Sequence, residues 1–66
     1  MKNNVHELRK NKKLTQEDLA KKLGVTRQTI ISIEQGKYMA SLPLAIKIAK
    51  VFDVTVEEVF ELEDKD

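Results

Sequence analysis

Residues 16–35 read QEDLAKKLGVTRQTIISIEQ, and this spacing predicts two short helices joined by a tight turn. Ala20 supplies the small side chain that is needed where two helices cross closely. Gly24 permits a turn of about three or four residues, because glycine adopts a positive φ at no steric cost. Ile30 and Ile33 lie on one side of the second helix and anchor it to the core. The opposite side then projects as a rigid rod, whose width fits the major groove of DNA.

Local signals mark the ends of both helices. Thr15 is a good N-cap for the first helix, and Asp18 comes close to completing a capping box. Thr26 caps the second helix, and Gly36 ends it. The buried face of the first helix consists of Leu19, Ala20 and Leu23. These signals predict one helix on each side of Gly24.

Three further helices are expected around this pair. The first covers residues 4–12, with Val5 and Leu8 facing inward. Ser41 caps another, whose apolar face consists of Leu44, Ala45, Ile48, Ala49 and Phe52. Thr55 and Glu58 form a capping box for a brief last helix. The chain therefore predicts an all-α fold of five helices.

Length and composition exclude several classes of protein. The 66 residues are expected to form a single domain, residues 1–66, and so short a chain buries only about 60% of its unfolded surface. There is no cysteine, and His6 is the single histidine, which excludes disulfides and metal sites rich in either residue. The chain begins without an export signal and contains no apolar run long enough to span a membrane. We therefore expect a cytoplasmic protein without cofactors, stabilised by helix packing, self-association or both.

Charge is divided unevenly along the chain. Residues 1–37 carry nine Lys or Arg against four Asp or Glu, whereas residues 38–66 carry three against seven. Four of the cations gather near the end of the first helix: Arg9, Lys10, Lys12 and Lys13. This division fits a first half that lies against a polyanion and a second half that a polyanion repels. The alternative is that the charges simply solvate the helix faces.

Residues 14–37, which read LTQEDLAKKLGVTRQTIISIEQGK, resemble the helix-turn-helix proteins of the phage-repressor and Cro class, also called the xenobiotic-response-element type. The likeness continues through residues 41–49 to Val59 and Phe60, and so covers nearly the whole chain. Residues 27–30 and 36–38 are most similar to compact regulators such as the cytolysin repressor. The resemblance implies a five-helix, lambda-repressor-like DNA-binding domain. It also implies a short strand pairing of the chain ends, for which residues 3–4 and 61–63 are long enough.

The resemblance implies that the helix after Thr26 is the recognition helix. Arg27 is expected to bind O6 and N7 of guanine, and Gln28 to bind N6 and N7 of adenine. Ile31 is expected to contact a thymine methyl group, and Ser32 to act as a less discriminating donor or acceptor. Outside such a motif, Arg27 and Gln28 would be ordinary solvated helix residues.

A second set of residues is expected to bind DNA phosphates and fix the register of the protein. The set consists of Gln16, Thr26, Thr29, Lys37 and Tyr38. Gln16 matches the family's phosphate-binding glutamine, and the free N–H groups of its helix add partial positive charge. As alternatives, Thr26 and Thr29 serve only as cap and surface residues, and Tyr38 packs on the domain. Glu34 is expected to make internal polar contacts, as the equivalent glutamate often does in the family.

One pair of residues departs from the family pattern. Related short regulators usually carry Asn-Pro or Asp-Pro just before the serine that caps the fourth helix, where this chain has Met39 and Ala40. The change frees the loop backbone and places an apolar methionine beside the face expected to meet DNA.

An apolar surplus near the C-terminus predicts a homodimer. The expected two-fold interface consists of Val54, Val56, Val59, Phe60 and Leu62. The alternative is that Val59 and Phe60 close the core of one chain, while Val56 and Leu62 face the partner.

These features predict a sequence-specific transcriptional regulator, a repressor that binds double-stranded DNA at a palindromic operator as a homodimer. The chain has no catalytic triad and no phosphate-cradling glycine loop, so an enzyme is not expected. It also has no feature of a small-molecule site or of a membrane site. The alternative is a protein-interaction module of the antitoxin type that also binds DNA. A stoichiometric partner recovered from the host would favour that alternative.

Overall fold

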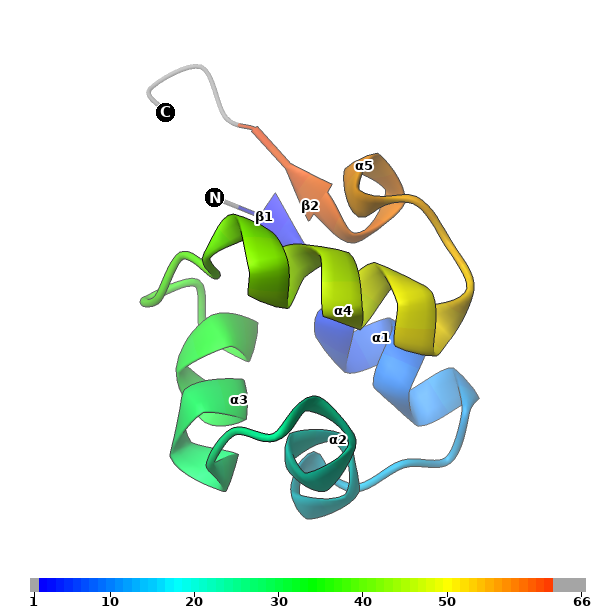
Figure 1. The fold of residues 1–66 in the computed structure, drawn as a ribbon, viewed down its shortest axis with the longest axis vertical. Coiled ribbons are helices and arrows are strands. Elements are labelled where there is room, and N and C mark those ends of the chain that lie inside the picture. The colour runs from blue at the N-terminus through cyan, green and yellow to red at the C-terminus, as the bar shows by residue number, and fades with distance from the viewer. Residues whose placement is uncertain (1, 63–66) are drawn as a thin grey trace.

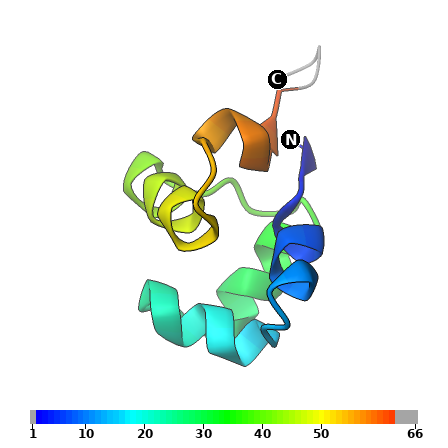
Figure 2. The ribbon, with the colours of Figure 1, turned by 90° about the vertical axis from the view of Figure 1, so that its right-hand side faces the viewer.

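A computed structural model describes residues 2–62 and confirms the all-α architecture with five helices. The helices are α1 (Val5–Asn11), α2 (Gln16–Leu23), α3 (Arg27–Glu34), α4 (Leu42–Phe52) and α5 (Val56–Val59). Two short strands, β1 (Lys2–Asn3) and β2 (Phe60–Glu61), join the chain ends. Figures 1 and 2 place α2 and α3 toward one end of the molecule, and α5 with the paired strands toward the other.

The helix boundaries follow from the predicted caps. The Thr15 hydroxyl accepts from the Asp18 backbone N–H and the Asp18 carboxylate accepts from the Thr15 N–H, each at 3.0 Å, which completes a capping box. Thr55 and Glu58 form an equivalent box before α5. Gly24 ends α2 with φ +73°, and a Cβ there would meet no atom within 4 Å. The glycine is therefore required by backbone conformation and not by lack of space.

The strand pairing is antiparallel, with Lys2 opposite Glu61 and Asn3 opposite Phe60. The terminal pairing is thus confirmed, but each strand lies one residue nearer the N-terminus than residues 3–4 and 61–63. Asn4 belongs to the start of α1, and its N–H donates to the Val59 carbonyl at 2.8 Å. The expected extension to residue 63 lies outside the described residues.

Asn3 ties the N-terminal strand to the helical core. Its side-chain Oδ1 accepts from the Val5 N–H at 3.1 Å, and its Nδ2 donates to the Ile33 carbonyl at 2.8 Å. Ile33 lies in the last turn of α3, so the N-terminal segment braces the helix that was expected to read DNA.

All five helices contribute to a single apolar core. Its fully buried side chains are Val5, Leu19, Ile30, Ile33, Ile48 and Val59. Ala20, a small residue of α2, is only 1% exposed, and α2 packs against both α3 and α4. Burial of the Ile30 and Ile33 side chains fixes the orientation of α3, and with it the face that α3 presents to solvent.

Candidate nucleic-acid interface

The outward face of α3 carries the predicted base-reading residues. Arg27 and Gln28 are exposed at the start of the helix, whereas Ile30 and Ile33 are buried. Ile31 and Ser32 are half-buried. A rigid helix that projects an Arg and a Gln from its first turn matches the way in which recognition helices present side chains to base edges.

Several predicted DNA contacts are brought together beside this helix. A shallow hollow of about 170 Å³ is lined by Thr26, Gln28, Thr29, Ser32 and Tyr38. The Tyr38 side chain is 46% exposed, so it lies at the edge of the hollow and remains accessible to a ligand. Residues expected to read bases and residues expected to bind phosphate therefore share one surface.

Thr26 and Thr29 act as a helix cap in the free protein. The Thr26 hydroxyl accepts from the Thr29 backbone N–H at 3.3 Å, and the two hydroxyls lie 3.1 Å apart. Thr26 is nevertheless exposed. A hydroxyl that accepts at a cap still has a hydrogen to donate, so capping and phosphate binding are compatible.

The segment after α3 is held against the helix by its backbone. Gly36 adopts φ +74°, and the N–H groups of Lys37 and Tyr38 both donate to the Ser32 carbonyl, at 3.0 and 3.3 Å. These two N–H groups are therefore already hydrogen-bonded. A contact of Lys37 or Tyr38 with a phosphate would have to be made by the side chain.

Gln16 is tied into the protein by its side-chain amide. It is the first residue of α2 and half-buried, and its Nε2 donates to Oε1 of Glu34 at 3.3 Å. Glu34 is the last residue of α3, so this hydrogen bond joins the start of one helix to the end of the next.

Glu34 makes the internal polar contacts that were expected of it, and its main partner is Arg9. The Arg9 Nε donates to Oε2 of Glu34 at 2.7 Å, and Nη1 donates to the Leu14 carbonyl at 2.8 Å. The side chains of Arg9 and Glu34 are only 11% and 7% exposed. Burial acts to raise the pKa of Glu34, but hydrogen bonds from Arg9, Gln16 and His6 outweigh it and hold that pKa below its usual range.

This burial sets Arg9 apart from the other cations at the end of the first helix, which are exposed. Arg9 lies four residues after Val5, which is fully buried, and residues at that spacing share a helix face. The spacing was therefore a signal in the sequence that Arg9 faces inward and needs a partner.

The comparisons with known proteins agree with this geometry. A family model described as helix-turn-helix matches residues 5–59. The chain belongs to the helix-turn-helix family. An uncharacterized HTH-type transcriptional regulator of Methanocaldococcus jannaschii is 62% identical over 64 residues, covering 97% of each chain. The regulator YgzD of Bacillus subtilis, also uncharacterized, is 51% identical over 65 residues, covering 98% of each.

A solved structure extends the likeness to three dimensions. The restriction-modification controller protein C.AhdI of Aeromonas hydrophila has a TM-score of 0.78 and 35% identity, covering 86% of each chain. Together these matches identify this helix-turn-helix chain as a transcriptional regulator with a DNA-binding domain, a class that is not enzymatic. The resemblance inferred from residues 14–37 is confirmed.

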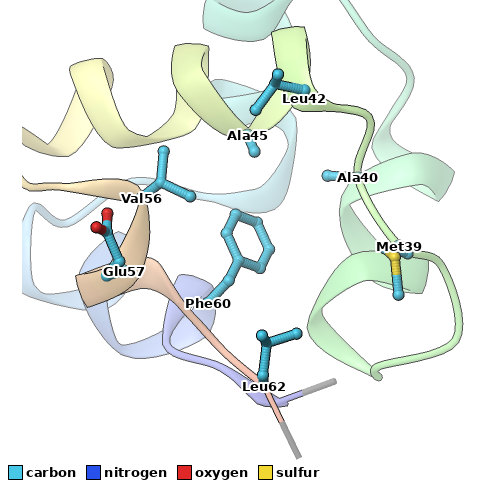
Figure 3. Close-up of a pocket in the computed structure, with 8 residues that line it drawn as sticks. All are labelled: Met39, Ala40, Leu42, Ala45, Val56, Glu57, Phe60 and Leu62. Atoms are coloured by element: carbon cyan, nitrogen blue, oxygen red, sulfur yellow. The ribbon is translucent and has the colours of Figure 1, made fainter. Parts of the chain in front are cut away.

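The helix-turn-helix protein also carries an open apolar groove, which no residue of α3 lines. The groove has a volume of about 350 Å³, and Phe60 lies at its centre (Figure 3). It is lined by Met39, Ala40, Leu42, Ala45, Val56, Glu57, Phe60 and Leu62. Leu62, Leu42 and Met39 are 74%, 69% and 62% exposed. Such exposure of large apolar side chains, close together on a small protein, is typical of an interaction surface.

Two residues of the interface expected from the sequence do not line this groove. Val59 is fully buried within the chain, so the alternative that it closes the core is the one observed. Val54 is half-buried against the core and does not line the groove. Met39 from the loop after α3 and Leu42, the first residue of α4, line it together with Phe60 of β2. Met39 thus lines the groove, and it also lies beside Lys37 and Tyr38, which are expected to meet DNA.

Two further observations concern other classes of site. Within residues 2–62, no helix is both long and apolar enough to cross a membrane. In the same part of the chain, no three His, Asp or Glu side chains are grouped so that they could hold a metal ion.

Proposed function

We propose that this chain is a sequence-specific transcriptional repressor that acts as a single domain, residues 1–66, in the cytoplasm. It binds a palindromic operator as a homodimer, with α3 of each protomer in the major groove of one half-site, and represses by occupying the site. The observation that carries the proposal is the position of Arg27 and Gln28. Both residues are exposed at the start of a helix that Ile30 and Ile33 anchor in the core.

The sequence specificity is assigned to four residues of α3. Arg27 reads guanine and Gln28 reads adenine, each through two hydrogen bonds in the major groove. Ile31 contacts a thymine methyl group, and Ser32 makes a less selective hydrogen bond. Phosphate contacts from Gln16, Thr26, Thr29, Lys37 and Tyr38 fix the register. The shared hollow beside α3 supports this division, because it places Gln28 and Ser32 next to Thr26, Thr29 and Tyr38.

The homodimer is assigned to the apolar groove. Val56, Phe60 and Leu62 from the expected interface line it together with Met39 and Leu42. A two-fold axis beside the groove would let the same surface of both protomers meet, as in most soluble dimers. Two recognition helices related in this way would read half-sites about 34–36 Å apart, one turn of DNA.

We do not propose the alternative function, an antitoxin-type module. The relatives are named transcriptional regulators, and a repressor accounts for both the Arg27 face and the groove without another partner.

Selection of bound sites from random DNA duplexes at two salt concentrations tests the proposal. We expect an enriched palindrome with two half-sites one turn apart, and an affinity that falls steeply with salt. Enrichment of a single asymmetric site would contradict the dimer, and the absence of any enriched sequence would contradict sequence-specific binding.

A further inference from the structure

We propose that Glu34 is a positioning residue for DNA binding, which holds the Gln16 side chain in the orientation that donates to a DNA phosphate. The inference rests on the proposed function, and it assigns a task to a residue that itself faces the interior. Glu34 has a side chain only 7% exposed, so it is not placed to contact DNA. Its effect passes through the hydrogen bond to Gln16.

The chemistry of the two side chains fixes which end of the amide is engaged. A carboxylate only accepts hydrogen bonds, so the atom of Gln16 that faces Oε1 of Glu34 must be the NH₂ nitrogen. That nitrogen carries two hydrogens, and the Glu34 bond uses one. The second N–H lies in the same fixed plane and remains free for an anion at the start of α2. Without Glu34, either end of the amide could face outward, and one of them would present an oxygen to the phosphate.

Glu34 is itself immobilised by a buried partner. Arg9 donates to both carboxylate oxygens, from Nε at 2.7 Å and from Nη2 at 3.3 Å. Arg9 also donates to the Leu14 carbonyl just before α2, so it braces the segment that leads into Gln16. The positive charge of Arg9 offsets the negative charge of Glu34. The Glu34 carboxylate can therefore lie next to Gln16 without strongly repelling a phosphate that Gln16 binds.

A side chain that is ordered before binding has less conformational freedom to lose when it meets its ligand. Ordering one flexible side chain at an interface weakens affinity by a factor of about two to ten. Loss of the Glu34 contact should therefore reduce the affinity for DNA by about that factor. The affinity should fall further if the Gln16 amide turns its oxygen toward the phosphate.

The test variant removes both members of the buried ion pair. Glu34→Leu alone leaves the Arg9 charge buried and unpaired, and such a variant can fail to fold. Arg9→Met with Glu34→Leu replaces the pair by apolar side chains, a change that proteins often tolerate. His6→Ala is the matched control, because it removes an exposed side chain whose Nδ1 lies 3.3 Å from Oε1 of Glu34 and 3.0 Å from Nη2 of Arg9, but it keeps the Arg9–Glu34 pair and the Gln16 hydrogen bond.

The first measurement needs no DNA. NMR relaxation of the side-chain amide groups in the free protein should show Gln16 ordered in the parent chain and in His6→Ala. In the Arg9→Met, Glu34→Leu variant, Gln16 should become as mobile as the exposed Gln35 amide. A Gln16 amide that stays equally ordered in the double variant would overturn the inference.

The second measurement is a mutant cycle on affinity for the selected operator. The Arg9→Met, Glu34→Leu change should weaken binding about twofold to tenfold when Gln16 is present, and should have no further effect in a Gln16→Ala background. Equal losses in both backgrounds would show that Glu34 acts only through the fold. If the parent chain bound no DNA sequence, the proposed function would fail, while the NMR result would still decide whether Glu34 holds Gln16.

Discussion

Arg9 and Glu34 join α1 to the end of α3 through a nearly buried ion pair. Removing two charges from water costs free energy, and such a pair is tolerated when its remaining hydrogen-bonding groups are satisfied. Arg9 meets this condition through the Leu14 carbonyl, and Glu34 meets it through Gln16. The pair therefore links the buried side of the helix-turn-helix to the segment that begins it.

The depressed pKa of Glu34 predicts a loss of stability in acid. The folded state holds fewer protons than the unfolded state, so this contribution is present above about pH 4.5, the ordinary glutamate value. It is lost as the pH falls through the lower pKa of the folded state. Asp18 acts in the same direction, because the Thr15 backbone N–H lowers its pKa. Denaturation at a series of pH values should show the free energy of unfolding falling below about pH 4.

The Arg9→Met, Glu34→Leu variant provides the control for this pH dependence. It lacks the Glu34 carboxylate but keeps Asp18, so its stability should fall less between pH 5 and pH 3 than that of the parent chain. An identical pH dependence in the two proteins would show that Glu34 has an ordinary pKa.

The boundaries of the helices depend on residues that are close together in the sequence, which is why they could be predicted. The Thr15–Asp18 and Thr55–Glu58 boxes each lie within four residues, and both form as expected. The exposed Arg27 and Gln28 likewise follow from the positions of the isoleucines on one helix.

Contacts between residues that are far apart in the sequence could not be predicted in the same way. The partner of Arg9 is 25 residues away along the chain, so spacing alone shows that Arg9 faces inward but not what it meets. Val59 was misplaced because α5 has only four residues, too few to define a buried face. The chain then turns directly into β2, and pairing with β1 decides the position of Phe60.

The backbone conformation of Gly24 can be tested by substitution. Its φ of +73° is strained for any residue with a Cβ, although a Cβ would meet no neighbouring atom. Gly24→Ala should therefore lower the free energy of unfolding by about 1–2 kcal/mol, measured by chemical denaturation. Gly24→Asn should cost less, because asparagine tolerates the left-handed region. Equal costs for both variants would point to a steric cause instead of a conformational one.

The hollow beside α3 and the apolar groove share the loop after α3. Tyr38 lines the hollow beside α3, and its neighbour Met39 lines the apolar groove. The positive first part of the chain supplies the Arg27 face, whereas Glu57 and Glu61 lie near the groove. This arrangement suits a dimer whose groove meets a second copy while the Arg27 face meets DNA.

Leu62→Glu tests the dimer. Leu62 is 74% exposed, so its replacement should leave the fold of one chain intact but place a charge in the apolar interface. Sedimentation should show the dimer dissociation constant raised at least about tenfold. Lys50→Gln is the matched control, since it makes the same change in net charge at an exposed position outside the groove. Unchanged association of Leu62→Glu would place the interface elsewhere.

The affinity of an Arg27→Ala, Gln28→Ala double variant for the selected operator would decide whether the outer face of α3 reads DNA. Both side chains are exposed, so thermal unfolding should confirm an intact fold. Each two-bond contact contributes about 1–3 kcal/mol of base discrimination, so affinity should fall by at least about tenfold and sequence preference should be lost at the contacted positions. A folded double variant that binds the operator as tightly and as selectively as the parent chain would contradict recognition by α3.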